Sequence, residues 1–82
     1  MNEVKGRPAA DHLTIALSGR VDSNNARQTE EAIMQLAASA PGLPIVLDLE
    51  ELNYISSAGL RVVLHLKKTN PALRLVNVNS DI

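Results

Sequence analysis

Cysteine, tryptophan and phenylalanine are missing from this 82-residue sequence, and a single tyrosine is its only aromatic residue. Without cysteine, the chain has neither disulfides nor thiolate metal sites. A net charge of −1 provides no basic field for nucleic acid or anionic lipid. No apolar run reaches the roughly 18 residues that cross a membrane. These absences predict a soluble, cytoplasmic domain with no nucleic-acid, membrane or metal partner and no cofactor.

The hydrophobic residues, 45% of the chain, are almost all leucine, isoleucine, valine and alanine. The core must therefore be aliphatic. A chain of this length has room for one core only, so we expect a single domain over residues 1–82.

Three segments have the pattern of strands. Residues 13–18 alternate apolar and small or polar side chains, with Gly19 expected to end the strand. Residues 44–49, PIVLDL, are nearly all aliphatic, which predicts a central strand covered by helices on both faces and followed by a loop over 50–55. Residues 73–79 are the third. A short edge strand is expected at residues 2–4, before a turn.

Two amphipathic helices are predicted between these strands. The first begins at Asn25, with a capping box to Gln28, and ends before Pro41. The resulting β-α-β order implies an α/β fold with a largely parallel sheet.

The second helix begins at Ser56 or Ser57 and must end before Pro71. It has two apolar stripes, and a helix of this kind usually buries only one. We expect the stripe containing Val62 and Leu66 to stay uncovered, so that the chain either self-associates or is only marginally stable. One stripe consists of Leu60, Val63 and Leu64, and the other consists of Val62 and Leu66.

The stretch ISSAGL, residues 55–60, places small residues where the chain passes from a strand to this helix. A serine here can cap the helix, and Gly59 can allow close packing. Alternatively, the small residues keep a hydroxyl accessible at the edge of the sheet where sites form. Position alone favours the structural interpretation and does not establish a function.

Two blocks of the sequence, LTIALSGRVDSNNA and VLDLEELNYISSAGLRVVLHLKK, resemble the STAS domains of bacterial anti-sigma factor antagonists. The shared features are Gly19-x-x-Asp22, the strand Leu47-Asp48-Leu49, and a serine-containing turn before Gly59. The resemblance implies a mixed, mostly parallel sheet with helices packed on it. It also implies that the chain lacks the family's C-terminal helix, since it ends where Ser80 and Asp81 would cap one.

The same resemblance implies a phosphorylation site at Ser57, two residues before Gly59. The expected partners are a serine kinase that is also the anti-sigma factor, and a phosphatase that removes the phosphate. Asp22 either meets a basic group of the kinase or caps the first helix. The expected partner-binding residues are Asp22, Ser23, Asn24, Ser56, Ser57, Ala58, Gly59, Leu60 and Arg61.

Two other functions remain open. One is a STAS subunit that is never phosphorylated and that regulates or scaffolds a transporter ATPase. The other is an enzyme, which has the least support because Ser57 lacks a histidine partner for acyl chemistry and no phosphate-binding loop is present. His12 and His65 are not at metal-ligand spacing.

Overall fold

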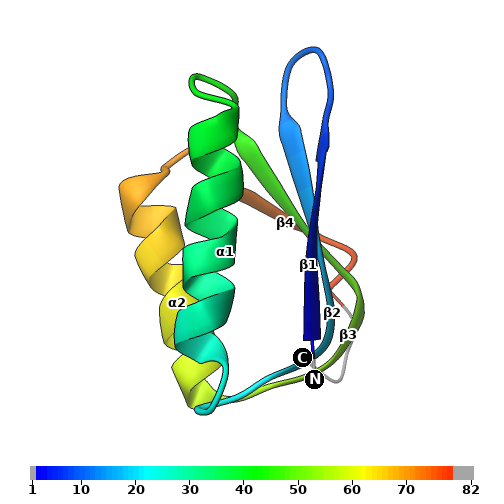
Figure 1. Ribbon diagram of the computed structural model, residues 1–82, viewed down its shortest axis with the longest axis vertical. Helices are drawn as coiled ribbons and strands as arrows, with labels where there is room; N and C mark the ends of the chain where they lie inside the picture. The colour runs from blue at the N-terminus through cyan, green and yellow to red at the C-terminus, as the bar shows by residue number, and fades with distance from the viewer. Residues whose placement is uncertain (1, 79–82) are drawn as a thin grey trace.

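Both helices of this protein pack on the same face of a four-stranded sheet (Figure 1). The computed structural model describes residues 2–78. The strands follow the order β1-β2-β3-β4, with β1 antiparallel to β2 and the other neighbours parallel. The predicted mixed, mostly parallel α/β fold is confirmed. The elements are β1 (Asn2–Pro8), β2 (Leu13–Val21), α1 (Ala26–Ser39), β3 (Ile45–Ile55), α2 (Ser57–Thr69) and β4 (Arg74–Val76).

The edge strand β1 is longer than predicted, because it includes Gly6 and Pro8, which the sequence favoured as turn residues. Its ladder with β2 runs from the pair Asn2 and Gly19 to the pair Pro8 and Leu13. An edge strand tolerates proline because one side of its backbone needs no partner. Gly6 also lets α1 approach, since a Cβ atom there would lie 3.0 Å from Leu36 Cδ2.

The predicted ends of β2 and β3 are wrong. Gly19 has a φ of 81° but does not end β2, and the expected loop over 50–55 belongs to β3. The pairing between the two strands shifts twice, between Ala16 and Ser18 and between Gly19 and Arg20. Such bulges bend a strand without ending it. As a result, the two strands run on together to the beginnings of both helices.

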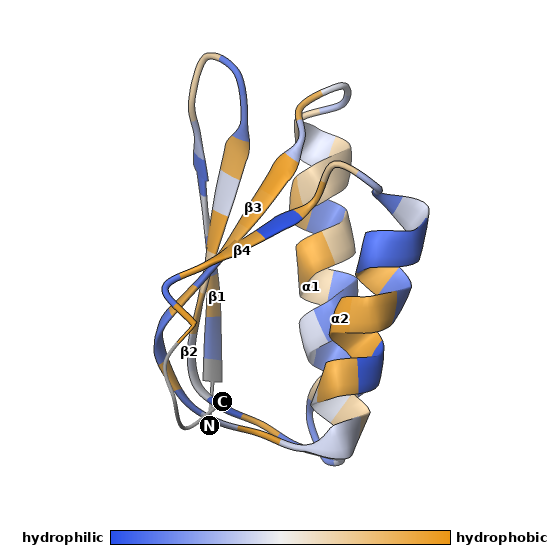
Figure 2. Cartoon of the chain, turned by 180° about the vertical axis from the view of Figure 1, so that it is seen from behind, coloured by the Kyte–Doolittle hydropathy of each residue, from blue (hydrophilic) through white to orange (hydrophobic). Residues whose placement is uncertain are grey.

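The core lies between the helices and one face of the sheet, where apolar segments of β2 and β3 face α1 and α2 (Figure 2). The prediction that helices cover both faces of β3 is therefore wrong. Two right-handed crossovers that step in the same direction across a sheet place both helices on one side. The buried strand residues are Leu13, Ile15, Leu17, Val21, Ile45, Val46, Leu47, Leu49 and Leu52.

The uncovered stripe of α2 is the opposite of the predicted one. Leu66 is buried and Val62 packs against the core, whereas Leu60 and Leu64 are 48% and 66% exposed. The rotation of the helix is set by Gly59, which is buried in the first turn; residues 59, 62 and 66 share that face. The prediction that Val62 and Leu66 stay uncovered is therefore wrong, and these two residues do not form an exposed surface for self-association.

The last strand, β4, is shorter than the predicted 73–79. It ends at Val76, because Asn77 has a left-handed φ of 57°. The amide of Asn77 then turns back and donates from Nδ2 to Asp48 Oδ1 at 2.9 Å. The expected capping residues Ser80 and Asp81 lie outside the described residues.

Acid is expected to weaken the link between Asp48 and Asn77. The hydrogen bond from Asn77, helped by the Glu50 N–H at 3.0 Å, lowers the pKa of Asp48. A carboxyl with a lowered folded-state pKa stabilises the fold above its unfolded pKa, near pH 4, and loses that contribution as pH falls further. Because Asp48 is partly exposed, the effect is small.

Urea unfolding of the native protein and of Asp48→Asn, at about pH 6 and about pH 3, measures this effect. The native protein should be the more stable of the two at the higher pH, and the difference should narrow at the lower pH. Glu51→Gln, on the same strand, is the control. A difference between the native protein and Asp48→Asn that is independent of pH would contradict the prediction.

Candidate functional site

The loop after β2 and the turn after β3 lie side by side at the carboxyl edge of the parallel strands. Val21 and Ile55 are register partners, and the N–H of Ser56 donates to Val21 O at 2.8 Å. Both helices begin at this end of the molecule (Figure 1). Open α/β sheets commonly place their sites at this edge.

The two adjacent serines have different roles. Ser56 is the N-cap of α2, and its Oγ accepts from the N–H of Gly59 at 3.3 Å. Ser57 is the first residue of the helix and is exposed. Within residues 2–78, no side-chain hydrogen bond engages its hydroxyl. The sequence left open which of the two serines caps α2. The structure shows that Ser56 is the cap and that the accessible hydroxyl belongs to Ser57.

Gly59 lies where the first turn of α2 packs against the ends of β2 and β3. A Cβ atom on Gly59 would lie 2.6 Å from Ile55 Cγ1 and 2.8 Å from Val21 Cγ1, so the first turn of α2 rests directly on the ends of β2 and β3. Only a residue without a side chain allows this approach. Gly59 is buried and Ala58 is partly buried against the core.

The outward side of α2 carries a row of exposed residues that we call the outer stripe. It consists of Ser57, Leu60, Arg61 and Leu64, at spacings of three and four that place them on one side of the helix. No acidic residue occurs in α2. The stripe therefore combines a free hydroxyl, two exposed leucines and a cation, a combination suited to contact with another protein.

Asp22 stabilises the loop before α1 through hydrogen bonds to the backbone of that loop. Its Oδ1 accepts from the N–H of Asn24 at 2.9 Å and of Asn25 at 3.2 Å. Asn25 Oδ1 accepts from the N–H of Asp22, and its Nδ2 donates to Arg20 O. The predicted capping box is wrong, because Asn25 makes no side-chain cap bond to α1. Ser23 and Asn24 are exposed on this loop, beside the turn of Ser57.

Sequence reasoning missed an exposed pair, Arg20 and Tyr54, at the same strand ends. They are register partners, and the Arg20 guanidinium carbon lies 4.4 Å from the centre of the Tyr54 ring. The alternation of side chains along a strand places them on the face opposite the buried Val21 and the partly buried Ile55. Two features of the sequence could have revealed this pair. One is the alternation of side chains along the strands, and the other is that Tyr54, the only aromatic residue of the chain, falls on the face opposite the apolar positions.

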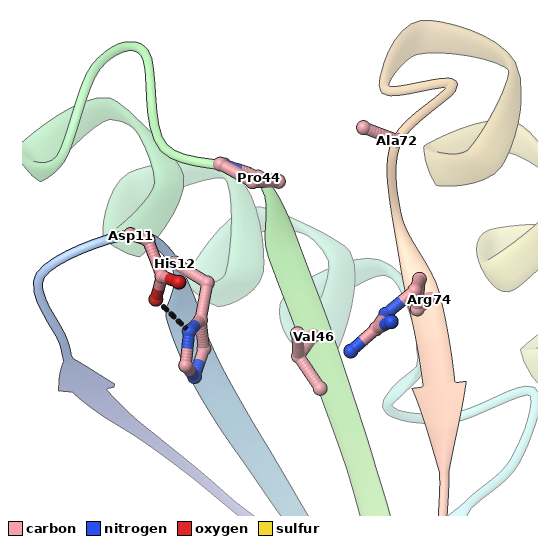
Figure 3. A pocket seen from close by; sticks show the side chains of 6 residues that line it. All are labelled: Asp11, His12, Pro44, Val46, Ala72 and Arg74. Atoms are coloured by element: carbon pink, nitrogen blue, oxygen red, sulfur yellow. Dashed lines mark hydrogen bonds and ion pairs between the residues drawn. The ribbon is translucent and has the colours of Figure 1, made fainter.

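A shallow hollow lies at the other edge of the sheet, by the first residues of β2, β3 and β4 (Figure 3). His12 Nδ1 is 2.7 Å from Asp11 Oδ1, and this hydrogen bond lowers the pKa of Asp11. The residues described by the structure contain no group of three or more potential metal ligands. Among the same residues, no helix is long and apolar enough to cross a membrane.

The fold and the serine turn define a small α/β domain of the STAS class. A family model described as "Mlab, STAS domain" matches residues 6–81, and the chain belongs to the STAS domain family.

A curated relative is the putative anti-sigma factor antagonist BtrV of Bordetella bronchiseptica. It is 50% identical over 58 residues, which are 68% of this chain and 47% of BtrV. The chain thus spans about half the length of this relative.

Two solved structures share the fold. An anti-sigma factor antagonist from Mycobacterium paratuberculosis superposes with a TM-score of 0.79 at 19% identity, covering 92% of this chain and 66% of the other. The unphosphorylated form of the anti-sigma factor antagonist SpoIIAA gives a TM-score of 0.72 at 20% identity, covering 94% and 74%. At these identities, the likeness concerns the fold.

Proposed function

We propose that this chain is an anti-sigma factor antagonist that is switched off by phosphorylation of Ser57. In the unmodified state it binds a serine kinase that is also the anti-sigma factor, and it releases that partner when phosphorylated. The observation that carries the proposal is the free, exposed hydroxyl of Ser57 beside the engaged hydroxyl of Ser56. The printed name of the relative BtrV supports the same role.

The kinase supplies the chemistry, and the chain is the substrate rather than an enzyme. Ser57 Oγ attacks the γ-phosphorus of ATP, its proton passes to a base of the kinase, and ADP leaves. The product carries about −1.5 to −2 charge at pH 7 at the first turn of α2. A phosphatase restores the hydroxyl. The cycle takes place in the cytoplasm.

Release follows from where the charge appears. The outer stripe presents Leu60 and Leu64 to the partner, and contact with them removes water from Ser57. A dianion at that position must lose its hydration when the partner docks, which opposes binding. The helix itself tolerates the charge, because the N-terminal end of a helix favours anions by about 0.3–1 kcal/mol.

The direct test is phosphorylation of Ser57→Ala. Incubation of the native chain with ATP and the kinase should add one phosphate, measured by intact mass, and the variant should accept none. Ser56→Ala is the matched control. It loses the cap and about 0.5–2 kcal/mol of stability, yet it keeps the acceptor and should still be phosphorylated.

Phosphorylation of Ser57→Ala at this turn would make Ser56 the acceptor. A native chain that accepts no phosphate from a kinase to which it binds would contradict the switch.

The exposed leucines also suit a second function, that of a permanent STAS subunit bound to a transporter ATPase. Leu64 lies two turns beyond Ser57 and is 66% exposed, so the apolar surface extends past the proposed phosphorylation site. Stable co-purification with an ATPase, with Ser57 unmodified throughout, would favour the subunit over the switch.

A further inference from the structure

Arg61 lies one helical turn beyond Ser57 on the outer stripe. Both residues are exposed, and within residues 2–78 the Arg61 guanidinium forms no ion pair or hydrogen bond. No carboxylate of α2 competes for it, since the helix has no acidic residue. A cation without a partner therefore stands next to the proposed phosphorylation site.

The helix geometry directs this cation toward Ser57. Residues four apart have Cβ atoms about 5–6 Å from one another. Helical side chains also lean toward the N-terminus, so that the side chain of residue 61 extends over residue 57. The fork of a guanidinium matches two phosphate oxygens, which makes arginine the preferred residue for paired contacts of this kind.

We propose that Arg61 binds the phosphate of phosphorylated Ser57 within α2. The proposal rests on the proposed function, because it requires a phosphate on Ser57. In the unmodified state, Arg61 is available to the partner. In the phosphorylated state the phosphate holds it, so that one modification removes two contacts, the hydroxyl and the cation, from the outer stripe.

Three other charged groups at this end of the molecule have partners, and one of them is Arg27 of α1, whose Nε lies 3.8 Å from Glu31 Oε1. Asp22 Oδ1 accepts from two backbone N–H groups of its own loop, and Arg20 stacks on Tyr54. The Gly59 N–H is used by Ser56 Oγ. Arg61 is thus the cation of α2 placed to bind the phosphate, while Lys67 and Lys68 lie in the last turn.

The test uses the chain with phosphoserine incorporated at position 57 during synthesis, so that no kinase is needed. The second pKa of a free phosphoserine is about 6, and titration followed by phosphorus NMR measures it in the protein. In the Arg61→Gln variant, that pKa should rise by about 0.15–0.4 units relative to the native sequence. Arg61→Lys should restore part of the difference.

Lys68→Gln is the matched control, since it removes one positive charge from the same helix, at its far end. Circular dichroism of each variant verifies that α2 remains folded. Equal phosphate pKa values in Arg61→Gln and Lys68→Gln would overturn the inference. That result would leave the proposed function intact, whereas failure of the kinase to modify Ser57 would remove the proposed function without changing this titration.

Discussion

Gly59→Ala is expected to destabilise this protein, lowering the free energy of unfolding by up to about 2 kcal/mol. The added methyl group would lie 2.6 Å from Ile55 Cγ1 and 2.8 Å from Val21 Cγ1. Overpacking of this kind typically costs about 1–3 kcal/mol. Alanine is favoured over glycine inside a helix by about 1 kcal/mol, which offsets only part of that cost.

Gly6→Ala is the control for this experiment. Its Cβ atom would meet the end of the flexible Leu36 side chain at 3.0 Å, and Leu36 can shift away. Urea unfolding of the two variants should therefore show the larger loss for Gly59→Ala. Equal stability of Gly59→Ala and the native chain would mean that α2 does not rest on β2 and β3 as described.

The same substitution tests how the serine turn is positioned. Moving the first turn of α2 away from Val21 and Ile55 shifts Ser57 relative to the loop of Asp22. Phosphorylation of Ser57 should therefore slow in Gly59→Ala under conditions in which both proteins are folded. It should be unchanged in Gly6→Ala.

Ser57→Asp is expected to weaken binding of the proposed partner, the serine kinase that is also the anti-sigma factor, at least tenfold while the fold survives. A carboxylate buried at an interface loses its hydration, and pairing with Arg61 repays this cost only in part. Each 1.4 kcal/mol of the remaining cost is about tenfold in affinity. The carboxylate should not unfold the chain, because the first turn of a helix favours negative charge. Aspartate has less charge and bulk than a phosphate, so release should be incomplete.

Titration calorimetry against the partner, together with thermal unfolding, measures both effects. Gln35→Glu is the control, because it adds the same charge on the exposed side of α1, away from the serine turn. Unchanged affinity with unchanged stability would oppose the switch and favour the permanent subunit. Loss of binding together with loss of folding would assign Ser57 a structural role only.

The sequence by itself determined the class of the fold and predicted the position of the candidate site. Period-two strands and amphipathic helices are local patterns, and their order already requires a mostly parallel sheet. The same patterns placed the two serines at a strand-to-helix turn, and the resemblance of the two blocks to STAS domains singled out Ser57 as the predicted phosphorylation site. The paired serines and Pro71 likewise marked the two ends of α2, because capping and helix termination depend on neighbouring residues alone.

Only the tertiary structure decided which parts of these elements are exposed. Pairing with β2 extends β3 to Ile55, a length that no local pattern in residues 50–55 indicates. Contacts of Gly59 with residues from two different strands set the rotation of α2. That rotation buries Leu66, exposes Leu60 and Leu64, and leaves the Ser57 hydroxyl free while Ser56 caps the helix. A periodic sequence shows that a helix has two apolar stripes, but the packing of distant residues determines which stripe faces the core.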